Sequence, residues 1–246
     1  MRLIVAVLSA VCLMNSANAQ WSAGFIGLGQ SNPYIAGDAG VRVFPAIAYQ
    51  GEKFVWRGPF IDYFLVGSQR SDSSFSVNLG LAPNNFEAEG DPRLTGINDR
   101  DSSFMAGVSV NTNVWGGRLT TRLQSELSDQ HNGQRMTLGW QTKIARSKQF
   151  KWAISGGVEL EYLSADFANY YYGVSPGEAA VSDFNSYRVG EVIQPQITIQ
   201  GFYSFTAKWR FIGNIGFQRL DNSIVTSPLV DGDTQYNIFT GLTYSF

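Results

Sequence analysis

His131 is the only histidine of the chain, and it is therefore the first candidate for a catalytic base. It lies in the run Asp129-Gln130-His131-Asn132-Gly133, whose residue types are typical of a turn or surface loop. A hydrolase built on it needs a serine within hydrogen-bond reach of the imidazole and a polar group that orients the ring. No local spacing supplies that serine. We expect His131 to be a solvated loop residue and the protein to be no enzyme, with a hydrolase centred on His131 as the remote alternative.

The chain offers few ligands for a metal ion or a cofactor. One histidine cannot form a histidine cluster, and Cys12 is the only cysteine. Oxygen ligands remain, for example at Asp91, Asp99 and Asp101, but they lack the spacing of a calcium-binding EF-hand loop. Gly27-Leu28-Gly29 is too short to be a phosphate loop, and we expect no helix after it. The sequence predicts no metal site and no cofactor.

The composition favours strands that have one face in lipid and the other in water. Charged residues are only 15% of the 246 residues, whereas there are 26 glycines, 17 phenylalanines, 11 tyrosines and 6 tryptophans. An average soluble domain has about 25% charged residues. The net charge of -2 gives no argument for a nucleic-acid partner.

The N-terminus has the three parts of a secretory signal peptide. Arg2 supplies the positive charge, residues 3–14 are apolar, and Ala17-Asn18-Ala19 is a typical cleavage site. We expect cleavage between Ala19 and Gln20. An apolar run of about 12 residues is too short to cross a bilayer as a helix, which argues against a membrane anchor.

Export divides the chain into two parts, a signal peptide at 1–19 and a single outer-membrane β-barrel domain at 20–246. A lipoprotein would instead be acylated at Cys12, but Ser9-Ala10-Val11 before it is a poor match to the motif that directs acylation. Removal of residues 1–19 leaves a mature chain without a thiol, so it has no disulfide and no thiolate ligand.

Hydrophobicity in the mature chain has a period of two residues, which is the period of a β-strand. In the segment 150–162 the even positions are apolar, with aromatics near both ends, and the odd positions are small or charged. This pattern is typical of a barrel strand with aromatic girdles at the two lipid interfaces. The alternative is a periplasmic β-sandwich, but polar faces such as Gln194, Gln196, Thr198 and Gln200 carry little of the charge expected on a solvent face.

We predict an all-β fold, a transmembrane antiparallel up-and-down β-barrel of about 12 strands, with ten as the alternative count. Pro195 cannot donate to a ladder, so we expect a bulge or local break there. The predicted strands are 21–30, 41–50, 53–58, 59–68, 73–82, 102–112, 115–127, 134–145, 150–162, 187–204, 207–220 and 235–246.

Loop lengths predict the orientation in the membrane. With both termini in the periplasm, the periplasmic connections are short, near Gln50-Gly51, 68–72, 112–114, 147–149 and Thr206. The extracellular connections include the long segments 83–101, 163–186 and 221–234. Short periplasmic turns and longer extracellular loops are the usual asymmetry of these barrels, which places the protein in the cell outer membrane.

The last strand carries a second signal. Tyr236, Leu242, Tyr244 and Phe246 lie on one face of it, and the chain ends on Phe246. This ending resembles the C-terminal aromatic strand that the outer-membrane assembly machinery recognises. We expect Tyr244 and Phe246 to form the assembly signal, with Phe246 in the periplasmic girdle beside Trp209 and Tyr203.

Two loop segments have distinctive sequences. The first is Tyr170-Tyr171-Tyr172-Gly173-Val174-Ser175-Pro176-Gly177-Glu178-Ala179, and the second is Ser227-Pro228-Leu229-Val230. Both resemble signatures of the MipA/OmpV family of outer-membrane proteins. Tyr171, Tyr172, Gly173, Ser175, Ser227 and Pro228 are the signature residues that we single out. Departures occur at Ala36-Gly37-Asp38 and at His131-Asn132-Gly133-Gln134. The simpler role for the tyrosines and prolines is to fold a long loop onto the barrel mouth.

The resemblance implies a non-enzymatic scaffold of the Gram-negative cell envelope, with roles in peptidoglycan biosynthesis. The resemblance implies similarity to a family member that acts as an adaptor between a lytic transglycosylase and a penicillin-binding protein. These two enzymes are therefore the partners that the resemblance implies for this chain. A pore or permeability-related porin and a surface adhesin are the alternatives. For a pore, the predicted lumen contains Arg118, Arg122, Lys143, Lys151 and Arg210 opposite Glu126, Glu159, Glu161 and Glu191.

Overall fold

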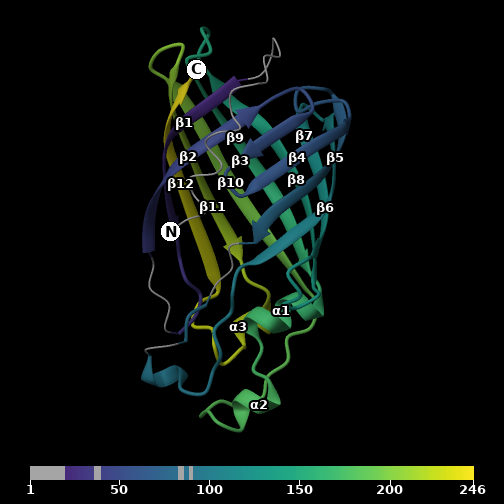
Figure 1. Ribbon diagram of the computed structural model, residues 1–246, viewed down its shortest axis with the longest axis vertical. Helices are drawn as coiled ribbons and strands as arrows, with labels where there is room; N and C mark the ends of the chain where they lie inside the picture. Colours follow the sequence, from purple (N-terminus) through teal and green to yellow (C-terminus); the bar gives the residue numbers. More distant parts are fainter. Residues whose placement is uncertain (1–19, 36–39, 83–85, 89–90) are drawn as a thin grey trace, which may run out of the picture.

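Twelve antiparallel strands form one closed barrel, which confirms the predicted fold class and strand count (Figure 1). The structure is a computed structural model that describes residues 20–35, 40–82, 86–88 and 91–246. The predicted signal peptide, including Ala19 at its cleavage site, lies outside the described residues. The strands are β1 (Gln20–Gln30), β2 (Gly40–Gln50), β3 (Phe54–Arg57), β4 (Phe60–Val66), β5 (Ser73–Ala82), β6 (Ser103–Val114), β7 (Gly117–Glu126), β8 (Gln134–Arg146), β9 (Trp152–Leu163), β10 (Val192–Ser204), β11 (Trp209–Arg219) and β12 (Thr234–Ser245).

Each strand pairs with the next one in the sequence, and β1 closes the barrel against β12. Ser22 lies opposite Ser245 in that closing pair, so both ends of the described chain lie at the same end of the barrel. The short connections lie at this end too, at 51–53, 67–72, 115–116, 147–151 and 205–208. We call these five turns the periplasmic rim, after the orientation predicted from the loop lengths.

The outer surface of the barrel is apolar, as the period of two predicts. On β9 the outward row contains Ile154, Val158 and Leu160, all exposed because nothing in the chain covers this face. The inward row contains Glu159 and Glu161, which face the lumen. Apolar residues on the outside and polar residues on the inside are the inverse of a soluble fold, and lipid must supply the missing cover.

Three details of the strands differ from prediction. β10 begins at Val192 rather than at residue 187, because Tyr187 pairs with Val174 in an isolated bridge between loops. The expected bulge at Pro195 is wrong: Pro195 stays in register with Leu160, and the β11 ladder begins only at Gln196, so no partner strand flanks the proline on that side. Register shifts occur instead between Phe64 and Val66 and between Lys143 and Ala145.

The packed core of the protein lies at the other mouth of the barrel, the extracellular end in the predicted orientation, and includes strand-end residues such as Met105 and Leu163. Four short helical segments occur there: η2 (Pro92–Leu94), α1 (Ala165–Tyr172), α2 (Pro176–Ala179) and α3 (Asn222–Val225). In Figure 1, α1 and α3 lie at the end of the barrel and α2 lies farther out. Segments 31–35, 86–88, 91–101, 164–191 and 220–233 bury one hydrophobic cluster between them, and we call them the extracellular cap. Among the described residues, no helix is long and apolar enough to cross a membrane.

Candidate functional site

Tyr171 and Tyr172, from the first signature segment, lie at the centre of the extracellular cap. Both are buried, and the Tyr171 hydroxyl donates a hydrogen bond to the Asp101 carbonyl over 2.9 Å. The Tyr34 hydroxyl donates to the Tyr171 carbonyl over 3.1 Å, and its ring stacks on Tyr172 with centroids 5.6 Å apart. Burial raises the pKa of Tyr171 to about 12. These contacts join loops that are more than a hundred residues apart in the chain, as Tyr34 and Tyr171 are 137 residues apart.

Gly173 and Ser175 set the path of the chain after α1. The Gly173 N–H donates to the Asn169 carbonyl and ends the helix, and a Cβ at Gly173 would overlap Asn169. Ser175 caps α2 and accepts a hydrogen bond from the Glu178 N–H, while the Glu178 carboxylate accepts one from the Ser175 N–H over 2.9 Å. This reciprocal capping box satisfies two backbone donors at the helix start.

The Glu178 carboxylate also forms a buried ion pair with Arg100, at 2.7 Å, with side chains only 4% and 7% exposed. The Asn98 backbone N–H and side-chain amide both donate to the same carboxylate. Burial alone would raise the pKa of Glu178, but the donors from Ser175, Asn98 and Arg100 outweigh it and lower the pKa to about 2. The Arg100 guanidinium in turn donates to the Tyr170 carbonyl over 2.6 Å. The buried ion pair and the hydrogen bond of Arg100 therefore hold the loop segment 91–101 against the loop 164–191.

Ser227 and Pro228, from the second signature segment, attach the loop before β12 to the same cluster. The buried Ser227 hydroxyl donates to the Tyr172 carbonyl over 2.6 Å. It also accepts a hydrogen bond from the Leu229 N–H, and Pro228 between them is partly buried. The two signature segments are thus in direct contact, and their positions suit loop packing better than direct binding of a partner.

His131 is buried against the cap, and the prediction of a solvated residue is wrong. Its Nε2 lies 3.0 Å from the buried Ser103 hydroxyl, a partner 28 residues away that the sequence pattern did not reveal. Its Nδ1 accepts a hydrogen bond from the Gly133 N–H over 2.9 Å, so the proton of the neutral ring is on Nε2. Burial lowers the pKa of His131 and keeps this neutral form. Nε2–H donates to Ser103 and cannot accept its proton, so the pair does not have the geometry of an activated nucleophile.

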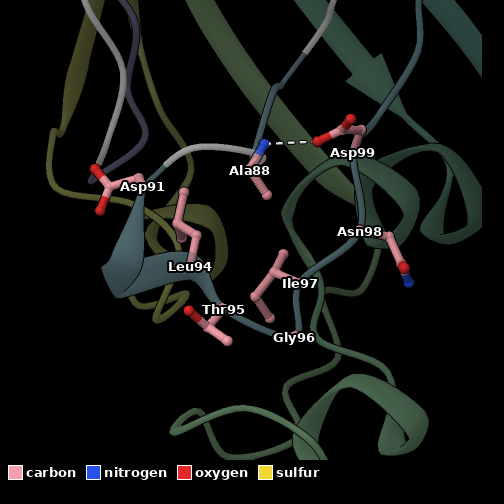
Figure 2. A pocket seen from close by; sticks show the side chains of 8 residues that line it. All are labelled: Ala88, Asp91, Leu94, Thr95, Gly96, Ile97, Asn98 and Asp99. Carbon is pink, nitrogen blue, oxygen red and sulfur yellow. Dashed lines mark hydrogen bonds between the residues drawn. The ribbon is translucent and has the colours of Figure 1, made fainter.

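The three aspartates considered as cation ligands do not converge. Asp91 pairs with Arg93 at 2.8 Å, and Asp99 accepts a hydrogen bond from the Ala88 N–H over 2.7 Å. Figure 2 shows Asp91 and Asp99 on opposite sides of a hollow of about 370 Å³ in the loop that contains η2. Within the described part of the chain, no three His, Cys, Asp or Glu side chains are grouped to hold a metal ion.

The periplasmic rim presents aromatic rings and positive charges. Trp115, at the tip of the 115–116 turn, is 82% exposed and has a left-handed backbone with φ of 52°. Phe150 has φ of 55°, and the Arg146 guanidinium lies 4.3 Å from its ring centre. The acidic residues of the five turns are Glu52 and Asp72. The basic residues at or beside the turns are Lys53, Arg70, Arg146, Lys148, Lys151 and Lys208.

Tyr244 and Phe246, the expected assembly signal, lie at the same end as this rim. Phe246 is 73% exposed and contacts the Tyr244 ring at 5.3 Å. Tyr244 contacts Trp209 at 5.2 Å, so it lies between Trp209 and Phe246. Tyr203 packs on Phe205 instead. Aromatic rings gather at this end as expected, but the expected neighbours of Phe246 are wrong: its ring contacts Tyr244, which separates it from Trp209.

The lumen has one polar side. Arg122 and Arg57 both approach Asp62, at 3.7 and 3.0 Å, and Arg135 pairs with Glu161. The registers place Arg118, Arg122, Lys143, Arg210, Glu126, Glu159 and Glu161 on the inward face, as predicted. Lys151 and Glu191 are the exceptions, because Lys151 lies in the 147–151 turn before β9. Glu191 is also outside the strands. It precedes β10 and interacts with the outward-facing Tyr162.

The family described as "MltA-interacting protein MipA" matches residues 24–246. The chain belongs to the MipA family. The "MltA-interacting protein" of Escherichia coli K12 is 30% identical to this MipA-family barrel over 217 residues, covering 87% of this chain and 86% of the relative. "Outer membrane protein OmpV" of Vibrio cholerae is 20% identical over 227 residues, covering 92% and 87%.

Among solved structures, the translocator domain of the autotransporter NalP from Neisseria meningitidis aligns with a TM-score of 0.42 and 10% identity, covering 98% of this chain and 92% of that domain. The family, the closed barrel and the names of the relatives together establish an outer-membrane β-barrel. These relatives are named as interacting or outer-membrane proteins and not as enzymes.

Proposed function

We propose that this MipA-family barrel is a non-enzymatic scaffold whose periplasmic rim binds a lytic transglycosylase and a penicillin-binding protein. The observation that carries the proposal is Trp115, a large ring held 82% exposed at a turn tip in a left-handed backbone. Such a backbone conformation costs about 1–3 kcal/mol in a residue other than glycine, and strained residues of this kind cluster at binding sites. The printed name of the E. coli relative supplies the class of partner.

The size of the rim sets how a partner must bind. A stable interface needs about 800 Å² from each partner, more than any single turn of two to six residues provides. A partner must therefore span several turns, which are adjacent around the barrel because β7 pairs with β8 and β8 with β9. Exposed aromatic anchors surrounded by basic side chains favour a partner with an acidic face.

Trp115→Ala should weaken capture of a purified lytic transglycosylase by the detergent-solubilised barrel by about tenfold or more, since aromatic anchors carry the largest share of binding energy. Capture is measured by surface plasmon resonance on the immobilised barrel. Heat-modifiable gel mobility should stay normal, because Trp115 contributes little buried area to the fold. Lys148→Glu combined with Lys151→Glu should also weaken capture and should reduce its dependence on salt.

Val181→Ala is the matched control, because Val181 is an exposed apolar residue of the opposite, extracellular end. It should bind like the unaltered barrel. Equal affinity of the Trp115→Ala and Val181→Ala variants would show that the rim is not the binding surface. Capture of no lytic transglycosylase by the unaltered barrel would overturn the scaffold function itself.

A pore is the second candidate, and the polar side of the lumen favours it. The extracellular cap opposes it, because its buried cluster draws on loops from around the barrel mouth. We expect no steady ohmic steps from the intact barrel in a planar bilayer, and we expect steps to appear when the cap is opened by Glu178→Ala. Steady conductance from the intact protein would favour the pore over the plugged scaffold.

A further inference from the structure

The barrel wall is incomplete on one side, between β2 and β5. β2 pairs with β1 over its whole length, but β3 pairs only with Ala48, Tyr49 and Gln50 of β2. The β3–β4 hairpin turns back at Gly58 and Pro59, and β4 pairs with β5 only as far as Leu79. Among the described residues, 40–46 of β2 and 80–82 of β5 therefore have no strand partner on the sides that face each other.

This unpaired stretch lies at the depth of the lipid tails. Tyr49 packs against Trp21 with ring centres 4.8 Å apart and marks the periplasmic girdle. Tilted strands advance roughly 2.5 Å of depth per residue, so residues 46 to 41 lie roughly 8 to 20 Å above that girdle within an apolar band of about 25 Å. The break therefore extends from just below the middle of the membrane into its outer half.

The exposure of side chains on β2 supports a break in the wall between β2 and β5. Val41 faces outward on β2 and is 79% exposed, whereas apolar outward residues on strands paired along both sides range from 39% at Leu138 through 59% at Ile197 to 66% at Phe25. Phe44 faces the lumen in the β2 register, yet it is 41% exposed. The inward face beside the break is therefore accessible rather than filled.

The lumen wall next to the break contains a group of apolar side chains, unlike the ion-paired side formed by β4, β7, β8 and β9, although Asn214 of β11 and Asn237 of β12 also face inward. The registers place Ile26 and Leu28 of β1, Phe44 of β2, Ile212 of β11 and Phe239 of β12 on the inward face. Arg42 is the charged residue of this wall beside the break, whereas the inward Arg210 of β11 lies at the periplasmic end. The exposed side chain of Arg42 has no ion pair or hydrogen bond among the described residues. Apolar side chains beside a free guanidinium suit a molecule that has an alkyl chain and an anionic head.

Unpaired backbone groups are costly in the hydrocarbon region and are tolerated where they line a water-filled or polar path. The extracellular cap covers the other route into the lumen from outside the cell. We propose that the break between β2 and β5 is a lateral portal through which an anionic acyl amphiphile passes between the outer leaflet and the lumen, with Phe44 beside its chain and Arg42 at its head. This portal is independent of the scaffold function of the rim.

The first test asks whether membrane lipid reaches the inside of the barrel. Residues 20–246 contain no cysteine, so single cysteines are introduced by Phe44→Cys, Thr198→Cys and Leu138→Cys and labelled with a small fluorophore. In vesicles of phospholipid with brominated acyl chains, the label at position 44 should be quenched nearly as strongly as the lipid-facing control at 138. The inward control at 198, on fully paired β10, should be at least threefold less quenched. Equal quenching at 44 and 198 would overturn the portal.

Folding of each variant is checked by heat-modifiable mobility, and Leu28→Cys on β1 replaces the first variant if Phe44→Cys does not fold.

The second test measures the binding of hexadecanoate, hexadecyl phosphate and uncharged hexadecanol to the barrel in a neutral detergent. Arg42→Ala should raise the Kd of both anions at least fivefold and leave that of the alcohol unchanged. Arg210→Ala, an inward arginine at the periplasmic end, is the control. Unchanged anion binding by Arg42→Ala would overturn the assignment of the head group, and quenching by bilayer lipid without hexadecanoate binding would identify a membrane lipid as the source.

Discussion

Glu178→Ala should open the extracellular cap and leave the barrel closed. The change leaves the Arg100 guanidinium buried, 7% exposed, without its carboxylate. Breaking a buried ion pair at one partner costs about 3–5 kcal/mol, and the Ser175 and Asn98 donors lose their acceptor as well. The expected result is rapid tryptic cleavage at Arg93, Arg100 and Arg188, at least tenfold faster than in the unaltered protein, with normal heat-modifiable mobility.

Glu87→Ala is the matched control, because Glu87 is an exposed carboxylate of the same loop. Its cleavage rate should equal that of the unaltered protein. Slow cleavage of the Glu178→Ala variant would show that the tyrosine cluster alone holds the cap, and loss of heat-modifiable mobility would show that cap and barrel unfold together.

The same carboxylate predicts how the cap responds to acid. The pKa of Glu178 is lowered to about 2 in the folded protein, below the value of about 4.3 for an unfolded glutamate. A lowered pKa means that the stabilisation is complete above pH ~4.3 and is lost as the pH falls towards 2. The near-ultraviolet circular dichroism of the cap tyrosines should therefore change near pH 2, and Glu178→Gln should remove that transition.

Deletion of Phe246 should lower the amount of protein in the outer membrane severalfold, although the inserted fraction should keep nearly normal heat resistance. Phe246 is 73% exposed, and even full burial of a phenylalanine is worth only about 1.5–3 kcal/mol, so its part in the folded state is small. Its larger expected effect is on recognition of the unpaired last strand before the barrel closes. Quantitative immunoblots of outer-membrane fractions measure the amount.

Phe205→Ala provides the comparison, because Phe205 is a similarly exposed aromatic of the periplasmic rim, away from the last strand. It should reach normal levels in the outer membrane. If deletion of Phe246 left the level unchanged but greatly reduced heat resistance, Phe246 would be a packing residue and not a recognition signal.

The strands were predictable because their signal is local. A period of two residues and short polar turns are visible within any window of ten residues, and they give the strand count and the faces of β9 and β12 correctly. The same reasoning extended β10 too far, because alternation continues through 187–191 into a loop that folds back on Val174. The proline at 195 was misjudged because a single strand does not show where its neighbour's ladder begins.

The cap was not predictable from local patterns. Arg100 and Glu178 are 78 residues apart, and Ser103 and His131 are 28 apart, with no periodicity that links either pair. The resemblance to a family drew attention to the tyrosines, whereas the charged and hydroxyl partners that hold them had no signal of their own. The break beside β2 had a weak sequence signal, because Arg57-Gly58-Pro59 leaves almost no loop and therefore allows only a short hairpin.

The closing pair of strands has a consequence for the order of events during assembly. Eleven of the twelve strand pairs join neighbours along the chain, whereas Ser31 and Tyr236, beside the β1–β12 seam, are 205 residues apart. The entropy lost in closing a loop grows with its length, so the seam is the costliest contact to form and depends on hairpins already in place. Until β12 pairs with β1, each of these two strands is an open edge of an unclosed sheet. The lifetime of that open sheet, rather than the stability of the finished barrel, then sets how much chaperone protection each molecule needs.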